Sequence, residues 1–549
     1  MNDSQSIEKA KSFFVSGLEK LNNNNFVGAE IDFEFSLSLA PNRLSTLINL
    51  SIVLIKLNKF ENAEKLINKG LLNHPKNKEL LLGLVDIYKK LTIHNPDYAE
   101  AHANLGNSYK ELKLYDEALA SYTHALRLNP NLAEIYSNRG IVFNELKKYQ
   151  EALKDYDKAI AIKPDYAVAY SNRGLVFNTI KKYQEALKDY DKAIAIKPDY
   201  EEVFLNKGDT LQSLNRFEDA LDSYDRAIEI KTDYVEAYWN KSLILLLAGD
   251  FVNGWNLYEY RWKLEILGSR IRTFPQPLWL GNENIRNKSI LLHAEQGLGD
   301  TIQFCRYAKL VKESGARVFL EAPKPLLSLL SELEGVDLLI ESGNKLPDFD
   351  YHCPLMSLPL AFKTELASIP NRKPYLAVDN NKHEKWAQKL GVKSKLLVGL
   401  VWSGSTTHKN DHNRSLTLQQ LLPYLSDLCE YVSLQKEVRE IDKQVLDGSN
   451  IKQYGDELND FSDTAALCEL MDLVISVDTS VAHLAGAIGK TTWVLLPHVP
   501  DWRWLLDRED SPWYPSIKIY RQPSHGDWDS VMKRIRHDLI EYSNNWKLR

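Results

Sequence analysis

The segment HAEQGLGDTIQF, residues 293–304, places a carboxylate directly after a Gly-Leu-Gly turn. The segment follows an apolar run and opens a predicted helix, as a phosphate-binding turn does. Asp300 would repel a phosphate there, whereas the helix dipole would keep its side chain ionised and ready to accept a proton. We therefore interpret Asp300 as a general base. A role as helix N-cap, for which Asp is among the preferred residues, is equally compatible with the spacing.

A dinucleotide-binding turn is the alternative interpretation of this glycine pair. It is disfavoured because Ile302 stands where GxGxxG requires its third glycine. Glu321 is the acidic residue that could close the second strand of such a unit. The segment therefore favours acid–base chemistry over cofactor binding.

A second candidate segment, SVDTSVAHLAGAIGK, spans residues 476–490 and starts another predicted helix. The hydroxyls and backbone N–H groups of Thr479 and Ser480 in its first turn predict an anion site. His483 lies one turn further along and could donate to a phosphate oxygen; alternatively, it pairs structurally with a neighbouring carbonyl.

A third segment, WSGSTTHKNDHNRS at residues 402–415, follows another predicted strand as a polar loop. Lys409 and Arg414 could face a diphosphate, although such a loop is as often a solvated surface. Three DxD pairs also occur, namely Asp155 with Asp157, Asp348 with Asp350, and Asp527 with Asp529. Their contexts are unrelated, so we expect no metal site.

Short apolar runs alternate with amphipathic stretches around these segments, which predicts parallel α/β structure. Expected strands lie within residues 289–293, 316–322, 336–342, 350–355, 395–404, 431–435, 451–455, 473–477 and 491–497. They predict two Rossmann-like lobes, residues 289–380 and 394–549, with a cleft at the carboxyl ends of their strands. A linker over residues 263–288 would precede them.

The first half of the chain carries a 34-residue repeat, clearest in the near-identical copies that start at Tyr136 and Tyr170. Small residues such as Gly140 and Ala152 recur with aromatic ones and a terminal proline, which predicts antiparallel helix pairs. The pattern resembles the tetratricopeptide repeat and covers residues 9–262, with one truncated repeat near 81–101. The resemblance implies an all-α superhelix with a concave face.

An asparagine recurs two positions after the first aromatic position of the repeats, where the side chain is expected to face the groove. The series consists of Asn49, Asn104, Asn138, Asn172, Asn206 and Asn240. Amides both donate and accept hydrogen bonds, so the last five are candidates for binding an extended acceptor peptide. The alternative is that each amide bonds only to its neighbours.

The repeats end in GDFVNGWNLYEYRW, residues 249–262, where bulky residues replace small ones, as in a terminal repeat that docks onto something. Near the other end of the chain, DWRWLLDREDSPWYP at residues 501–515 contributes Trp502, Trp504 and Trp513, which we expect to line the cleft.

Composition excludes several classes of protein. The net charge of −6 does not favour nucleic-acid binding, and no apolar run is long enough for a membrane span. The acidic and polar N-terminus does not resemble a signal peptide, and the four cysteines lack CxxC spacing. We therefore expect a cytoplasmic location.

Together, the GLGD, WSG and DTSVAHLAGA segments resemble the bacterial heptosyltransferases, inverting GT-B enzymes that use nucleotide-activated sugars. The complete chain resembles bacterial fusions of tetratricopeptide repeats with such a domain. The resemblance implies that Asp300 is the catalytic base, that Arg414 faces the donor diphosphate, and that no metal or cofactor is needed. The expected donor site comprises Gly297, Gly299, Trp402, Ser403, Lys409, Arg414, Gln435, Asp478, Thr479, Ser480 and His483.

The repeats are a departure from the heptosyltransferases, so a lipid-sugar acceptor need not carry over. The layout is similar to that of the O-linked N-acetylglucosamine transferases, which favours a protein acceptor such as flagellin or another Ser/Thr hydroxyl. The expected function is therefore transfer of sugar from a nucleotide sugar to a protein held by the repeats. The alternative is a repeat scaffold whose glycosyltransferase-like domain is inactive.

Overall fold

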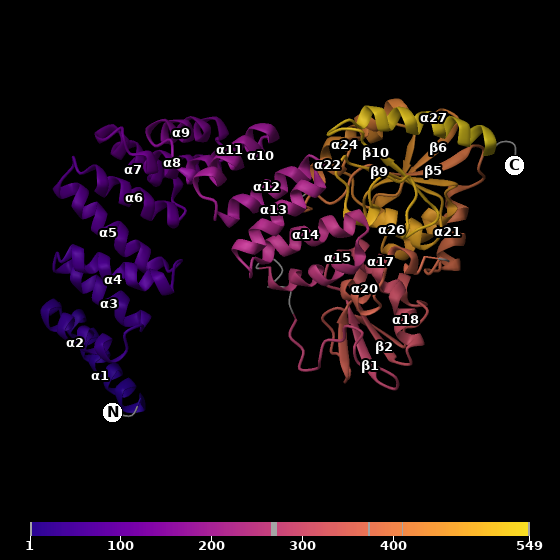
Figure 1. Cartoon of the computed structure of the whole chain (residues 1–549). Helices are drawn as coiled ribbons and strands as arrows, with labels where there is room; N and C mark the ends of the chain where they lie inside the picture. Colours follow the sequence, from indigo (N-terminus) through magenta and orange to yellow (C-terminus); the bar gives the residue numbers. More distant parts are fainter. Residues whose placement is uncertain (1–2, 265–271, 372–373, 409, 547–549) are drawn as a thin grey trace. The chain divides into compact units, whose positions relative to one another are not determined.

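The structure is a computed structural model that describes residues 3–264, 272–371, 374–408 and 410–546. Lys409, expected in the donor site, lies outside the described residues. The chain forms two compact units, Met1–Thr210 and Leu211–Arg549, and each is described by itself (Figure 1).

The first unit consists of antiparallel helix pairs, as the repeats predict. Its helices are α1 (Asp3–Asn22), α2 (Phe26–Leu39), α3 (Leu44–Lys56), α4 (Phe60–Asn73), α5 (Lys78–His94), α6 (Ala99–Glu111), α7 (Tyr115–Leu128), α8 (Ala133–Glu145), α9 (Tyr149–Ile162), α10 (Ala167–Thr179), α11 (Tyr183–Ile196) and α12 (Glu201–Ser213), the last crossing into the second unit. In the truncated repeat, α5 is followed directly by α6, with only residues 95–98 between them.

Glycine sets the close approach of the two helices in a repeat. A Cβ atom at Gly140 would lie 2.8 Å from the ring of Tyr156, and one at Gly174 would lie 2.7 Å from Tyr190. Both tyrosines are fully buried. The recurrence of small and aromatic residues therefore reflects ring-on-backbone packing between paired helices.

The second unit begins with helices that continue the repeat pattern, α13 (Phe217–Ile230), α14 (Val235–Ala248) and α15 (Phe251–Tyr258), and with the 3-10 turn η1 (Glu259–Lys263). Phe251, Trp255 and Tyr258 belong to the same apolar core as strand residues such as Leu292. The packing boundary therefore lies near Leu211, upstream of the expected sequence boundary at residue 262.

Two parallel sheets follow. The first has the order β3-β2-β1-β4, with β1 (Ser289–His293), β2 (Arg317–Ala322), β3 (Leu338–Glu341) and β4 (Tyr351–Pro354). The second has the order β10-β9-β8-β5-β6-β7, with β5 (Leu396–Val401), β6 (Cys429–Ser433), β7 (Ile451–Gln453), β8 (Leu473–Val477), β9 (Thr492–Leu496) and β10 (Ile517–Arg521).

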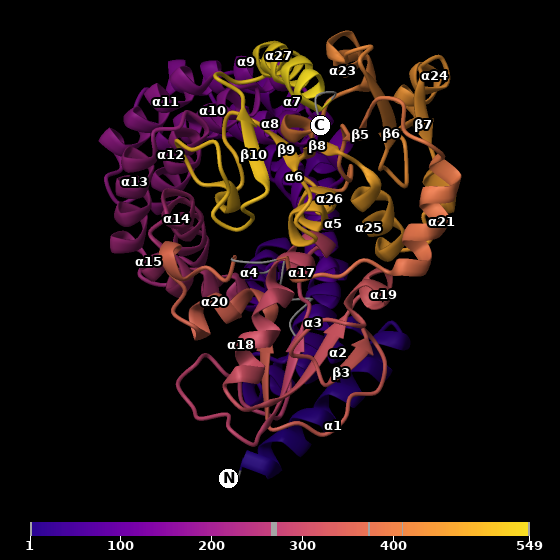
Figure 2. The same ribbon diagram turned by 90° about the vertical axis from the view of Figure 1, so that its right-hand side faces the viewer.

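Helices cover both sheets. They are α17 (Leu298–Phe304), α18 (Ala308–Glu313), α19 (Leu327–Leu330), α20 (Leu358–Ala361), α21 (Asn380–Leu390), α22 (Asp411–Arg414), α23 (Leu418–Leu421), α24 (Glu440–Asp447), α25 (Phe461–Leu470), α26 (Ser480–Ala487) and α27 (Trp528–Trp546). Helices α17 and α26 contact each other between the two sheets (Figure 2). In the described part of the chain, no helix is long and apolar enough to cross a bilayer.

Candidate functional site

The candidate residues follow strands at which the order of each sheet reverses. In the first sheet, β1 has β2 on one side and β4 on the other; in the second, β5 lies between β6 and β8. Asp300 follows β1, Arg414 follows β5 and Thr479 follows β8. Ligands of parallel α/β folds bind in the crevice at such reversal points, so the topology gathers residues distant in the sequence into one place.

Asp300 is the third residue of α17, not its N-cap, which is Gly297. The Gly297 N–H donates to Oδ2 of Asp300 at 2.8 Å, so the carboxylate reaches back to the start of the helix. Its other oxygen, Oδ1, accepts from Nη2 of Arg503 at 2.5 Å. The N-cap interpretation is thus corrected in position, while a contribution of Asp300 to capping is retained.

Gly299 allows α17 to approach the N-terminus of α26. A Cβ atom at residue 299 would lie 3.0 Å from Cδ2 of His483 and 3.4 Å from Cα of Ser480. Thr479 is the N-cap of α26, and its hydroxyl lies 3.2 Å from that of Ser476. The N–H groups that open α26 therefore lie close to the turn that carries Asp300.

His483 is buried and is held by aromatic neighbours. Its Nδ1 lies 3.0 Å from the hydroxyl of Tyr514, and its ring stacks on Trp504. Burial, reinforced by the charge of Arg503, lowers the pKa of His483 to about 3. The side chain is therefore neutral at physiological pH, and its partner is a tyrosine hydroxyl instead of the carbonyl considered from the sequence.

Arg414 joins the loops that follow β5 and β8. Its Nη1 donates to the backbone oxygen of Asp478 at 2.9 Å. Its guanidinium lies against Gly404, where a Cβ atom would be only 2.6 Å from Nη2. Burial and the nearby charge of Asp501 raise the pKa of the Asp478 carboxyl, and Arg414 opposes this rise.

Three expected donor-site residues lie behind the loop after β5. Trp402, Ser403 and Gln435 are all buried, and Oε1 of Gln435 accepts from the backbone N–H groups of Trp402 at 2.8 Å and Ser403 at 3.0 Å. The Trp402 indole donates to Asp442 at 2.9 Å. The side chains of these three residues therefore stabilise the conformation of the loop that follows β5.

Arg503 is a site residue that sequence reasoning missed. It lies in the 3-10 turn η8 (Trp502–Trp504), donates to Asp501 at 2.8 Å, and stacks on the ring of Trp502 at 4.2 Å. In the stretch DWRWLLDREDSPWYP, the arginine between two tryptophans is the signal that could have indicated this residue.

The tryptophans of this stretch do not line a cleft. Trp502, Trp504 and Trp513 are 4%, 0% and 1% exposed. Trp502 packs edge-on against Trp255 of the terminal repeat, and Trp513 packs against Phe304. The expectation is corrected because these rings form part of the core.

The repeat asparagines differ in their contacts. Asn49 donates to the Ser45 oxygen at 2.8 Å, and Asn138 donates to Oδ1 of Asn107 at 3.0 Å. These two bond to neighbours, whereas Nδ2 of Asn172 is buried without a hydrogen-bond partner among the described atoms. The other members, Asn104, Asn206 and Asn240, are half-buried.

The DxD carboxylates take part in ordinary structural contacts. Asp350 accepts from the Ser289 N–H at 2.8 Å, Asp155 pairs with Arg139 at 2.7 Å, and Asp527 accepts from the Ser530 N–H at 3.0 Å. Among the residues that the structure describes, no group of three or more His, Cys, Asp or Glu is placed to hold a metal ion.

Comparison with known proteins identifies the repeats. The tetratricopeptide-repeat family matches residues 99–132, 131–199 and 165–233. The chain contains tetratricopeptide repeats. Over 338 residues it is 25% identical to Protein FlbA of Caulobacter vibrioides, covering 55% of this chain and 54% of that protein. The chain thus matches about half the length of this curated relative.

Solved structures with similar helices include MamA, with 26% identity over 28% of this chain and 91% of that one, and a TM-score of 0.27. YrrB, a TPR protein with an unusual peptide-binding site, is 23% identical over 38% of this chain and 98% of that one, with a TM-score of 0.26. Tetratricopeptide repeats suggest a peptide or protein partner.

Proposed function

We propose that the chain is an inverting glycosyltransferase that moves a sugar from a nucleotide sugar to a protein. The observation that carries the proposal is the meeting of Asp300, the N-terminus of α26 and Arg414 where both sheets reverse their order. A carboxylate beside helix N–H groups and a guanidinium suits a reaction with one proton to remove and one anion to stabilise.

In this mechanism, an acceptor hydroxyl attacks the anomeric carbon from the face opposite the nucleotide. Asp300 takes the hydroxyl proton as the new C–O bond forms, and the diphosphate leaves with the electron pair of the bond that breaks. The N–H groups of Thr479 and Ser480 and the guanidinium of Arg414 stabilise the leaving diphosphate. The configuration at the anomeric carbon is inverted, and the charge stabilisation requires no metal ion.

We assign the acceptor to the repeats, because tetratricopeptide repeats are protein-interaction modules. The proposed acceptor is a Ser or Thr hydroxyl of a protein, with flagellin as the candidate that the family resemblance suggests.

A second candidate function is a repeat scaffold whose α/β domain binds a ligand without turnover. Both oxygens of Asp300 are already engaged, by Gly297 and Arg503, which favours a structural carboxylate. The two candidate functions differ in the fate of a bound nucleotide sugar. A glycosyltransferase would cleave it, whereas a scaffold would leave it intact.

A panel of nucleotide sugars, screened by thermal shift and then by sugar release, tests the proposal. A donor at 100 times its Kd should stabilise the folded state by about 2.7 kcal/mol. Arg414→Ala should weaken that binding by about 1.5 to 3 kcal/mol, and Asp300→Asn should bind donor but release little sugar. Binding without any release by the wild-type chain would favour the scaffold.

A further inference from the structure

The terminal repeat segment, residues 249–262, reaches the turn that carries Asp300. Helix α15 and turn η1 present Trp255, Tyr258 and Arg261 to the α/β domain, and all three side chains are at most 2% exposed. This explains the bulky residues in GDFVNGWNLYEYRW, because the segment is a docking element with its partner in the same chain.

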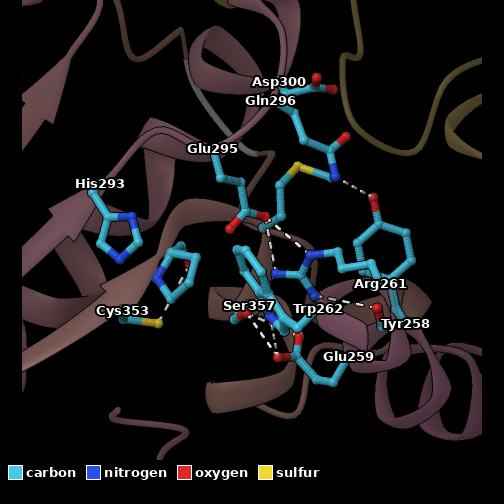
Figure 3. Close-up of polar contacts among 12 residues, drawn as sticks. Tyr258, Glu259, Arg261, Trp262, His293, Glu295, Gln296, Asp300, Cys353 and Ser357 are labelled. Atoms are coloured by element: carbon cyan, nitrogen blue, oxygen red, sulfur yellow. Dashed lines mark hydrogen bonds and ion pairs between the residues drawn. The ribbon is translucent and has the colours of Figure 1, made fainter. Parts of the chain in front are cut away.

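Arg261 is the centre of this contact (Figure 3). Its Nε and Nη2 donate to Oε1 of Glu295 at 3.1 and 2.9 Å, and Nη1 donates to Glu259 at 2.5 Å. Nη2 also donates to the Ser357 hydroxyl at 2.7 Å. A guanidinium this deeply buried needs such partners, so its geometry is fixed by several bonds at once.

Gln296, which follows Glu295 in the turn, is also held by the terminal repeat segment. Gln296 donates through Nε2 to the Tyr258 hydroxyl at 3.2 Å (Figure 3). Backbone N–H groups fix the ends of this turn, since that of Ala294 donates to the backbone oxygen of Glu321 and that of Gly297 donates to the carboxylate of Asp300. Its middle, Glu295 and Gln296, is therefore held by side chains from the terminal repeat.

Arg503, the other partner of Asp300, rests on the same surface. Its guanidinium stacks on Trp502, whose ring packs against Trp255 at 5.2 Å and against Tyr258 at 6.0 Å between centroids. The terminal repeat segment therefore contacts both the turn that carries Asp300 and, through Trp502, the arginine Arg503 that pairs with Asp300.

We propose that Arg261 and Tyr258 are positioning residues that set the place of Asp300, so that the terminal repeat is a working part of the catalytic site. This inference rests on the proposed function for its effect on turnover, but not for its effect on the turn. The segment acts through Glu295 and Gln296 on the turn and through Trp502 on Arg503.

Hydrogen exchange of the full-length protein, read on peptides covering residues 294–304, tests the positioning directly. Tyr258→Phe removes one hydroxyl and keeps the ring, and we expect these amides to exchange about 2- to 10-fold faster, as the loss of one hydrogen bond implies. Arg261→Met should have a larger effect, and Arg261→Lys should restore part of the protection. Tyr307→Phe is the matched control, because this buried hydroxyl pairs with Thr364 instead of the turn.

Sugar release by the same variants tests the effect on the reaction. We expect kcat to fall more than donor affinity does, since Arg261 and Tyr258 hold the turn that carries the base, whereas Arg414, Thr479 and Ser480 of the proposed donor site lie in other segments. Faster exchange in these variants, together with a wild-type chain that transfers no sugar, would reject the proposed function and keep the positioning role. Unchanged exchange in folded Tyr258→Phe and Arg261→Lys would overturn the inference whatever the activity, even if Arg261→Met fails to fold.

Discussion

Asp300 lies between a backbone donor and a guanidinium, and this determines what asparagine would do there. Asn has one oxygen and one NH₂ group, so it can accept from Gly297 or Arg503 but must turn a donor toward the other. We expect Asp300→Asn to fold with a loss of about 1 kcal/mol, as the loss of one hydrogen bond implies, and to transfer sugar about 100- to 10,000-fold more slowly.

Turnover and thermal unfolding of the purified variant check this prediction. Asp350→Asn is the control, because Asp350 also accepts from a backbone N–H but lies at the Ser289 end of β1. Near-wild-type transfer by Asp300→Asn would remove Asp300 from the role of base.

Because Glu295 is buried, we expect the free energy of unfolding to depend on pH. Burial raises its pKa from an ordinary 4.5 to about 7, with Arg261 opposing and the charges of Glu259 and Asp300 contributing to the rise. The folded state therefore holds this proton more tightly than the unfolded state does. Its contribution is full below pH 4.5 and is lost as the pH rises through 7.

Glu295→Gln cannot titrate and should therefore lose less stability than wild type between pH 5 and 7.5. Urea unfolding followed by tryptophan fluorescence measures this, and taking the difference between the two proteins cancels the groups they share. Glu334→Gln, an exposed partner of Lys309, is the control. Parallel pH curves for wild type and Glu295→Gln would contradict the prediction.

The sequence predicted the positions of those candidate site residues that follow a strand in their own lobe. Asp300, Arg414 and Thr479 could be found because carboxyl ends of parallel strands meet at one edge. Arg503 was missed because its contact with Asp300 joins two sheets and spans 203 residues. The tryptophans were misplaced because an aromatic residue in a sequence does not distinguish a cleft from a core.

At the scale of elements, the approach of α17 to α26 depends on Gly299. The Cβ atom added by Gly299→Ala would contact the buried ring of His483 and the backbone of Ser480 closely, and neither can move easily. We expect a loss of about 1 to 3 kcal/mol from overpacking, together with weaker donor binding. Gly448→Ala, where the same atom would make ordinary contacts, is the control. Equal melting temperatures for the two variants would contradict a close packing role.

Helix α2 breaks the surface pattern of the later repeats. Val27 and Ile31 are 60% and 49% exposed, and the corresponding positions of α4 hold the exposed Glu61 and Lys65. Replacing Val27 by Glu and Ile31 by Lys should change stability by no more than about 0.5 kcal/mol and should raise solubility. Melting and precipitation assays check this, with the buried Phe33→Ala as the destabilising control, at about 3 to 5 kcal/mol. A large loss of stability in the double variant would show that these side chains are packed.

At the scale of the molecule, periodicity predicted the helical repeats followed by parallel α/β structure, and both are confirmed. Strand β10 and the long helix α27 were not predicted, since the run SIKIYR is short and half polar. The start of the second compact unit at Leu211 could not be predicted either. The repeat period predicts which neighbouring helices pair along the chain. The packing partner of α15 depends instead on distant residues such as Phe304 and Trp502, which contact Trp255.

This boundary yields a prediction about truncation. A fragment of residues 211–549 keeps the terminal repeat and should melt cooperatively and bind donor, although it should transfer sugar to protein poorly without the preceding repeats.

A fragment of residues 263–549 loses Phe251, Trp255, Tyr258 and Arg261, whose removal uncovers Trp502 and leaves Glu295 buried without its guanidinium. Each large aromatic lost from a core costs about 3 to 5 kcal/mol, so the three aromatics together cost about as much as the whole stability of a typical domain, about 5 to 15 kcal/mol. Circular dichroism melting and gel filtration should therefore find the longer fragment folded and the shorter one aggregated. Equal melting of both fragments would mean that the terminal repeat does not stabilise the α/β domain. Equal transfer to protein by residues 211–549 and by the full chain would show that residues 1–210 do not hold the acceptor.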